Sequence, residues 1–360
     1  MKYSLSLGKI AGIKIFVHWT FSILIGWIIF SNLQAGHSAT QVFWSVLFVL
    51  SIFLCVTLHE LGHALAARRY HIETLDITLL PIGGLARLKS IPEKPSEELV
   101  VAAAGPLMNI LIFLALIPFT YSYFETFDPR SLGIVDANSF LPTLAVINLW
   151  LAVFNLIPAF PMDGGRILRS LLSFKLPRQK ATQIAARIGQ VLAIGFVFLG
   201  FFGNPFLIFI GLFIFLGAQA EATFVHTKSF LKDFYAHDVL MKEYKTIESN
   251  EPVRTAVAML LNGQCKTFLV TDNEIPVGVL TREHIIQLLS ESGADALVQN
   301  RMDTTLPKID SLTPLDQLYQ RMIEDKAQLA LITQHGNFVG VVDMENIAEF
   351  VMIRNAQIKA

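Results

Sequence analysis

The apolar run from Val42 to Ala67 contains two histidines and a glutamate, in the order His59-Glu60-Leu61-Gly62-His63. The run is long enough to cross a bilayer as a helix, which takes about 20 residues. An ionisable side chain at membrane depth costs about 3 kcal/mol unless a partner or a metal compensates for it. The group therefore indicates a functional site in a membrane protein. The alternative is two packing histidines beside an isolated glutamate.

The spacing of the two histidines suits a metal ion. Residues four apart on a helix lie on one face and about 6 Å apart along its axis, so His59 and His63 can bind the same ion. Glu60 follows the first histidine directly, where it can act on a metal-bound water without entering the coordination shell. Catalytic zinc usually has three protein ligands, so the pair leaves one ligand to be found.

A candidate for this ligand follows a later apolar block, in the segment Asn155-Leu156-Ile157-Pro158-Ala159-Phe160-Pro161-Met162-Asp163-Gly164-Gly165. Its two prolines break the helix, which lipid tolerates only where the freed backbone groups are buried or face a cavity. Asp163 stands at this break. From spacing alone, a third metal ligand and an ordinary Asp-Gly turn or helix N-cap explain it equally well.

Composition and block pattern predict a multi-pass α-helical membrane protein. The chain is 53% hydrophobic and 16% charged, which is far too apolar for a soluble globular protein. Its net charge of −1 gives no field that would attract nucleic acid. About six transmembrane helices are predicted from the apolar blocks Ile10–Phe30, Val42–Ala67, Leu99–Phe119, Leu141–Phe160, Ile188–Phe202 and Phe206–Ala222.

The loop charges agree with an even number of spans. Lysines and arginines gather after the second and the fourth block, whereas the connections 31–41 and 203–205 contain none. By the positive-inside rule, the N- and C-termini are both cytosolic and the chain is a multi-pass protein of the cell membrane. The second and fourth spans then run inward, so the histidines and Asp163 approach the same cytosolic end.

The two motifs together resemble those of the site-2 protease family of intramembrane zinc metalloproteases. That family combines H-E-x-x-H in one span with N-x-x-P-x-x-P-x-D-G in a later one, and both stand here in that order. The resemblance covers about residues 1–225 and, with the C-terminal domain, extends to the prokaryotic branch that includes the sporulation proteases. It implies that His59, His63 and Asp163 are zinc ligands and that Glu60 is the general base.

A short β-like hairpin is predicted after the second block. Leu75, Ile77 and Leu79 alternate with polar residues ahead of Pro81-Ile82-Gly83-Gly84. One interpretation is an edge strand at Gly83 and Gly84 that pairs with an unwound substrate by β-augmentation; the other is a structural loop. Asn155, two helical turns before Asp163, is a further candidate for substrate binding.

The C-terminal part of the chain is soluble in composition and repeats itself after about 61 residues. Met241 and Pro252 recur as Met302 and Pro314, and each copy predicts a helix after the proline, two strands around a turn and another helix. The expected domain bounds are 1–225 for the intramembrane metalloprotease domain, 226–235 for a linker, and 236–292 and 293–360 for the two copies.

The repeat resembles a tandem pair of cystathionine-β-synthase (CBS) domains, an α/β module that often binds adenine nucleotides. The ribose-binding pattern of that family, G-h-h-[ST]-x-x-D, is degraded here. The first copy keeps Thr281 but has His284 at the last position, and the second has Asp343 and Asn346. Thr281 and Asp343 are the candidate nucleotide contacts. Nucleotide sensing, homodimer formation and substrate docking all stay open as functions of the pair.

The resemblance implies an intramembrane zinc endopeptidase with one Zn²⁺ per chain. It would hydrolyse peptide bonds of membrane-protein substrates in or near their transmembrane segments, close to the cytosolic face, in regulated proteolysis. The CBS pair would regulate the enzyme or dock its substrate. The alternative is a membrane metal-binding or transport protein, but such a protein would spread its polar ligands across the membrane midplane.

Overall fold

The computed structural model describes residues 4–81, 83–89, 92–120, 135–263 and 266–359. The chain forms two compact units that divide between Thr223 and Phe224. Each unit has hydrophobic cores of its own, and the first unit holds both metal-ligand motifs.

Among the described residues, four helices are long and apolar enough to cross a membrane. They are α2 (Ala39–Arg68), α3 (Pro95–Leu116, followed by the 3-10 turn Ile117–Phe119), α7 (Arg178–Phe202) and α8 (Phe206–Leu231). Large apolar side chains such as Phe201, Phe202 and Phe209 are exposed on their outward faces. Helices that are apolar all round fit a lipid environment, so the protein is a membrane protein.

Two further apolar helices are shorter, α1 (Thr20–Gln34) and α5 (Phe140–Asn155). With 15 and 16 residues, each is about 23 Å long, less than the roughly 30 Å of a hydrocarbon core. The predicted first span, Ile10–Phe30, is wrong in its first half, because Ile13–His18 form a strand and the helix begins only at Thr20. The count of six spans depends on these two helices and stays a prediction.

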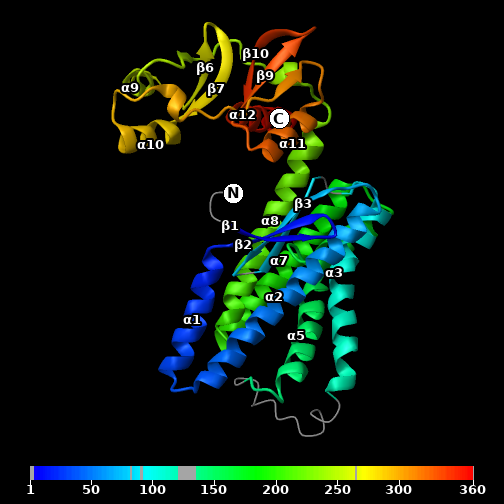
Figure 1. The fold of residues 1–360 in the computed structure, drawn as a ribbon. Coiled ribbons are helices and arrows are strands. Elements are labelled where there is room, and N and C mark those ends of the chain that lie inside the picture. The colour runs from blue at the N-terminus through cyan, green and yellow to red at the C-terminus, as the bar shows by residue number, and fades with distance from the viewer. Residues whose placement is uncertain (1–3, 82, 90–91, 121–134, 264–265, 360) are drawn as a thin grey trace. The chain divides into compact units, whose positions relative to one another are not determined.

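A four-stranded sheet packs against α2 beside the histidine motif. Its strands are β1 (Ser4–Ile10), β2 (Ile13–His18), β3 (Thr74–Leu80) and β4 (Gly83–Leu88), in that order, with β2 and β3 parallel and the outer pairs antiparallel. Ile13, Ile77 and Leu79 are buried against Leu61 and Ala64 of α2. Figure 1 shows the sheet at one end of the helices. The predicted hairpin is confirmed as β3–β4, and β4 lies at the edge of the sheet.

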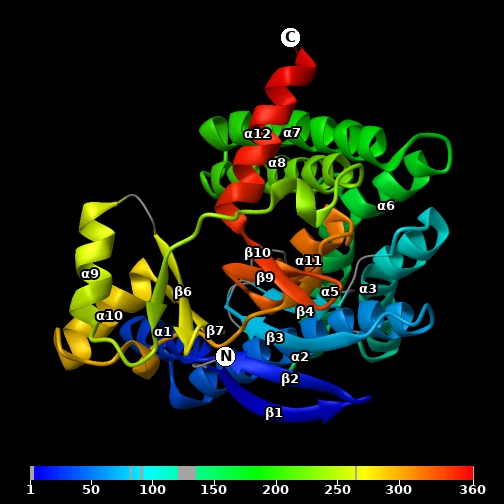
Figure 2. The ribbon, with the colours of Figure 1, turned by 90° about the horizontal axis from the view of Figure 1, so that it is seen from above.

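The prolines after α5 lead into a short helix, α6 (Asp163–Ser173), whose N-cap is Met162. Asp163 is therefore the first residue of a helix and not its cap. α7 and α8 then form a hairpin around the predicted turn at Gly203–Pro205 and lie side by side in both views (Figures 1 and 2). Small buried residues such as Ala185 and Ala218 allow the close packing of this pair.

The second unit contains two copies of one motif, which confirms the predicted repeat. The first copy has β5 (Thr246–Glu248), α9 (Val253–Asn262), β6 (Thr267–Asp272), β7 (Ile275–Thr281) and α10 (Arg282–Ser292); the second has β8 (Lys308–Asp310), α11 (Leu315–Asp325), β9 (Leu329–Gln334), β10 (Asn337–Asp343) and α12 (Met344–Lys359). In each copy the first strand is parallel to the second, and the second is antiparallel to the third. The 3-10 turns Ala236–Val239 and Val298–Asn300 precede the copies.

α8 continues into the segment expected to be a linker, residues 226–235. Its last residue, Leu231, is buried in the core of the second unit with Leu315 and Leu318. Residues 226–231 are therefore helical, and only the four residues up to Tyr235 separate α8 from the turn that begins at Ala236.

Candidate metal centre

Three buried side chains from distant parts of the sequence meet at the C-terminal half of α2. His63 Nε2 lies 3.1 Å from His59 Nε2 and 3.1 Å from Asp163 Oδ2, and His59 Nε2 lies 3.2 Å from the same oxygen. Within the described part of the chain, these residues form the group of His, Cys, Asp or Glu side chains that can share a metal ion. The structure thus brings together the three ligands implied by the two motifs.

The hydrogen bonds of His59 determine which of its nitrogens faces the centre. Its Nδ1 lies 2.5 Å from Asn109 Oδ1 on α3. The Asn109 amide nitrogen donates to Asn148 Oδ1 at 2.9 Å, and the Asn148 amide nitrogen donates to Leu144 O. This chain of donors fixes Asn109 Oδ1 as an acceptor, so Nδ1 of His59 carries the proton. In the neutral ring, Nε2 is then a bare lone pair aimed at the centre.

His63 is oriented in the same way by a backbone group. Its Nδ1 lies 2.7 Å from the carbonyl oxygen of Val101 on α3. A carbonyl can only accept, so Nδ1 donates and Nε2 is a lone pair in the neutral ring. With both rings neutral, two imidazole lone pairs and the Asp163 carboxylate converge at about 3 Å. Such an arrangement is repulsive unless a metal ion or an added proton lies between the donor atoms.

The donor set and its spacing fit zinc. Two imidazoles and one carboxylate are ordinary zinc ligands, and three protein ligands leave a fourth position for water or substrate. Zinc bonds of about 2.1 Å in a tetrahedron place neighbouring ligand atoms about 3.4 Å apart. The observed separations of 3.1, 3.1 and 3.2 Å are close to this value. Small adjustments of three side chains would complete the geometry.

Gly105 of α3 allows this helix to approach the two histidines. A Cβ atom at that position would lie 2.2 Å from His63 Nε2 and 2.7 Å from His59 Cε1. These distances are far inside a van der Waals contact, so only glycine fits between α3 and the imidazole rings.

Glu60 lies beside the ligand group and contacts the edge strand β4. The N–H of Ala86 donates to Glu60 Oε2 at 3.2 Å. A Cβ atom on Gly84 would lie 2.7 Å from Glu60 Cγ, so the strand passes directly over this side chain. Arg87 Nε donates across the hairpin to buried Asp76 at 2.9 Å, which fixes β4 on β3. Glu60 does not belong to the group of described side chains that can share one metal ion.

The remaining membrane-unit candidates lie on two elements, the strand β4 and the helix α5. Gly83 begins β4 with φ of +140° and has open space where a Cβ would stand. Gly84 lies against Glu60, as described. Asn155 ends α5, and its amide nitrogen donates to Leu151 O one turn back at 2.9 Å. The edge strand is thus near the catalytic candidate, whereas the Asn155 amide is engaged within its own helix.

The sequence analysis missed three contacts on α3. Asn109 hydrogen-bonds Asn148 of α5 and also orients His59. Gly105 acts by having no side chain, which no metal-ligand motif records. Val101 contributes a backbone carbonyl, for which a sequence has no signal, because every residue carries one.

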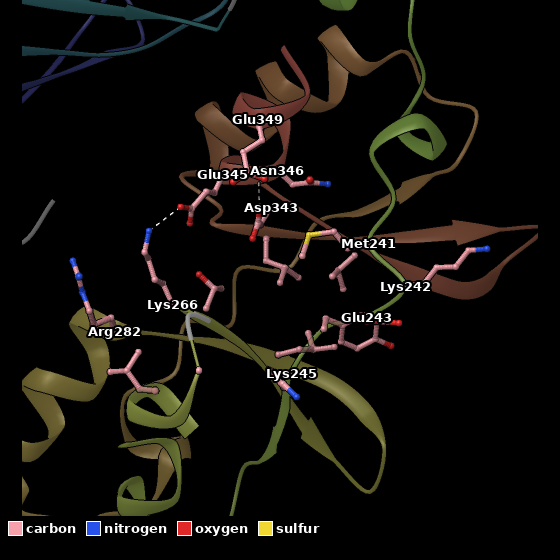
Figure 3. A pocket seen from close by; sticks show the side chains of 17 residues that line it. Met241, Lys242, Glu243, Lys245, Lys266, Arg282, Asp343, Glu345, Asn346 and Glu349 are labelled. Atoms are coloured by element: carbon pink, nitrogen blue, oxygen red, sulfur yellow. Dashed lines mark hydrogen bonds and ion pairs between the residues drawn. The ribbon is translucent and has the colours of Figure 1, made fainter. Parts of the chain in front are cut away.

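A pocket of about 1060 Å³ lies between the two copies in the second unit (Figure 3). Four basic and four acidic side chains line it, so the pocket has no excess of positive charge for a polyphosphate: Lys242, Lys245, Lys266, Arg282, Glu243, Asp343, Glu345 and Glu349. Figure 3 shows Lys266 paired with Glu345, at 2.8 Å. Burial raises the pKa of the Asp343 carboxyl above its usual value.

The two nucleotide candidates occupy equivalent positions in the two copies. Thr281 caps α10, because its hydroxyl accepts from the N–H of His284 at 3.3 Å. Asp343 precedes α12 and accepts from the N–H of Asn346 at 2.7 Å. Asp343 lines the pocket, whereas Thr281 is not among its lining residues. Both side chains therefore have a structural role at a helix N-terminus, and one of them also faces the cavity.

Comparison with known proteins gives two family matches. The model of peptidase family M50 matches residues 47–136 and 130–196, and that of the CBS domain matches residues 236–291. Zinc metalloprotease MJ0392 of Methanocaldococcus jannaschii is 36% identical over 78% of this chain and 78% of that protein. Stage IV sporulation protein FB of Bacillus subtilis is 31% identical over 38% of this chain and 44% of its own length.

A solved structure is also similar to part of this chain. The site-2 protease from Methanocaldococcus jannaschii is 42% identical and covers 61% of this chain and 95% of its own, with a TM-score of 0.45.

Proposed function

The chain belongs to peptidase family M50, the site-2 protease type of zinc metalloendopeptidase, and on that premise we propose that it cleaves membrane-protein substrates within or near their transmembrane segments. The observation that carries the proposal is the convergence of His59, His63 and Asp163 beside Glu60, where three donor atoms lie about 3 Å apart and can share one metal ion. The hydrogen bonds that orient the two rings toward this centre support a metal site.

We assign the metal ligands and the general base accordingly. His59, His63 and Asp163 would hold one zinc ion, which supplies a positive charge that polarises a peptide carbonyl and acidifies a water molecule. Glu60 accepts a proton from the attacking water and gives a proton to the departing amine. Asn109 and the Val101 carbonyl keep the two imidazole rings in place during these steps.

The edge strand β4 supports a role in substrate binding. A transmembrane helix satisfies its own carbonyls, so it must unwind before one of them can react. An unwound segment can pair with an edge strand. β4 is one: it begins at Gly83, passes over Glu60 at Gly84 and gives its Ala86 N–H to Glu60. Substrates would then have helix-weakening residues at the cut. The bond to Leu151 O uses one amide hydrogen of Asn155, so its side chain stays a candidate for substrate binding.

The proposed orientation places the cut close to the cytosolic face of a cell membrane. Arg68 ends the motif helix α2, Arg69 follows it, and Lys175 follows α6. Positively charged residues next to spans mark the cytosolic side, and an even number of spans puts both termini there. His63 lies five residues before Arg68 and Asp163 three residues before Arg166, so the site would be open to peptide segments near that surface.

Co-expression with a single-span test protein examines the function directly. We expect cleavage when the cytosolic third of the span contains Gly-Pro, and much less when the same positions are leucine. The Glu60→Gln variant serves as the matched control, because it keeps the ligands and removes the base. Equal cleavage by both enzymes, or cleavage confined to soluble segments far from the span, would contradict the proposal.

We propose that the CBS pair docks substrate or forms a homodimer, with nucleotide control as a second possibility. The balanced charge of its pocket and the capping role of Thr281 and Asp343 favour docking or homodimer formation over nucleotide binding. Removing residues 236–360 and repeating the co-expression tests whether the pair acts on proteolysis at all. A cleavage rate equal to that of the full chain would exclude both substrate docking and nucleotide control.

A further inference from the structure

One face of α3 contains four buried residues at successive turns: Glu98, Val101, Gly105 and Asn109. Steps of three and four residues place them in one row along the helix. Asn109 orients His59, the Val101 carbonyl orients His63, and Gly105 gives both rings their space. Glu98, the first residue of this row, bonds to arginines and not to the two histidines in the hydrogen bonds of the described residues.

Glu98 instead holds the helix that carries the third ligand. Arg169 of α6 is fully buried at 0% exposure, and its Nε donates to Glu98 Oε1 at 3.0 Å while Nη2 pairs with the same oxygen. Its Nη1 pairs with Glu221 of α8, and its guanidinium stacks over Phe160 with 5.0 Å to the ring centroid. The next residue, Ser170, donates to the Pro95 carbonyl at the start of α3.

A buried arginine that joins two helices has a large unfavourable desolvation free energy. Removing such charges from water is costly, and apolar residues of similar volume often stabilise a protein as well or better. What the guanidinium provides beyond stability is direction, because its planar fork fixes the rotation and the translation of α6 on α3. Asp163 is the first residue of this same helix.

We propose that Arg169 and Glu98 are positioning residues for the metal centre. They lock α6 on α3 so that Asp163 meets the two histidines, which are oriented by the same face of α3. α3 is then a common template for all three ligands although it contributes none. This inference rests on the zinc site proposed above, and it deepens that proposal by naming the residues that set its geometry.

Zinc affinity of the full-length protein in detergent tests the inference, measured by competition with a chromophoric chelator. In R169K the charge stays but the two-nitrogen fork is lost, so we expect a folded protein whose zinc affinity is about tenfold lower, at the low end of the range for groups that orient ligands. The control is R178A. Arg178 of α7 donates to the same Glu98 oxygen at 3.1 Å, but it lies on a helix without a ligand. We expect R178A to change zinc affinity less than twofold.

A double variant separates positioning from stability. In E98L/R169L both buried charges are gone, so its metal-free unfolding temperature should recover relative to R169L alone. Its zinc affinity should stay about tenfold or more below that of the wild type, because apolar packing does not fix direction. A purely structural role predicts that affinity recovers together with stability.

Three outcomes would overturn the inference alone: R169K with wild-type zinc affinity, the double variant with restored affinity, or R178A with a loss equal to that of R169K. Absence of zinc uptake by the wild-type protein would refute the proposed function and this inference together. The two failures are therefore distinguishable in one set of titrations.

Discussion

Gly105→Ala adds one methyl group at the closest approach of α3 to the metal-ligand candidates. The new Cβ would lie 2.2 Å from His63 Nε2, 2.5 Å from His63 Cε1 and 2.7 Å from His59 Cε1. Contacts of both rings are shortened at once, so a rotation of one imidazole does not relieve the clash.

The size of the effect follows from these distances. An ordinary contact begins at 3.4 Å, so the shortest one, at 2.2 Å, requires α3 and His63 to separate by about 1.2 Å. Metal ligands are held to within about 0.2 Å of their ideal distances, so a displacement this large removes a ligand from the centre. We expect zinc affinity to fall by at least about 100-fold, the upper end of what loss of ligand orientation costs. The metal-free protein should lose about 1–3 kcal/mol from overpacking.

Zinc content after purification in detergent, together with thermal unfolding of the metal-free protein, measures both effects. Gly195→Ala is the matched control, because Gly195 lies in the long helix α7 with no atom within 4 Å of its added Cβ. That variant should bind zinc normally and unfold at or above the wild-type temperature. Stoichiometric zinc and full activity in Gly105→Ala would refute the close packing of α3 on the two histidines.

Three further outcomes are expected. Glu60→Gln should keep its zinc and lose about 10²–10⁴-fold in cleavage rate, because only the proton acceptor is removed; turnover at the wild-type rate would refute the assignment of the base. Asp163→Ala should retain less than stoichiometric zinc after detergent purification, and full metal content would place the third ligand elsewhere. Titration of the full-length protein with ATP and AMP should show binding weaker than about 1 mM, and a tighter site would favour nucleotide control over docking.

The apolar blocks predicted the long helices well because this signal extends over many residues. α2 is predicted directly by its long apolar run. The α7–α8 hairpin is predicted by an apolar run that Gly203 and Pro205 interrupt. The strand Ile13–His18 was missed because its alternating apolar residues adjoin an apolar helix, and a hydropathy average merges the two. Short apolar runs do not distinguish a strand from a helix until their neighbours are known. Here the neighbour is β3, about sixty residues later in the chain.

The candidate site was predictable where a side chain itself performs the chemistry. His59 and His63 are four residues apart on one helix, so local geometry alone brings them together. Asp163 lies 100 residues beyond His63, and its spacing could not separate a ligand from a turn. That ambiguity is physical, because an aspartate before two glycines fits either role until α6 is placed on α3. The resemblance to a family supplied what local spacing lacked.

α3 shows why the geometry of such a site is harder to read than its chemistry. Its buried row acts through a carbonyl, a missing side chain and a charge that faces another helix, none of which belongs to a metal-binding motif. The opposite row, Leu107, Leu111 and Leu114, is about half exposed and suits lipid contact. Both rows belong to one helix that is apolar on both faces. Its hydropathy therefore predicts a membrane span but does not indicate which row faces the metal-ligand candidates. The difference between the two faces of α3 is seen only in the contacts that each residue makes. On that basis, changes along the buried row should alter metal binding, whereas apolar changes along the lipid row should leave the ligands where they are.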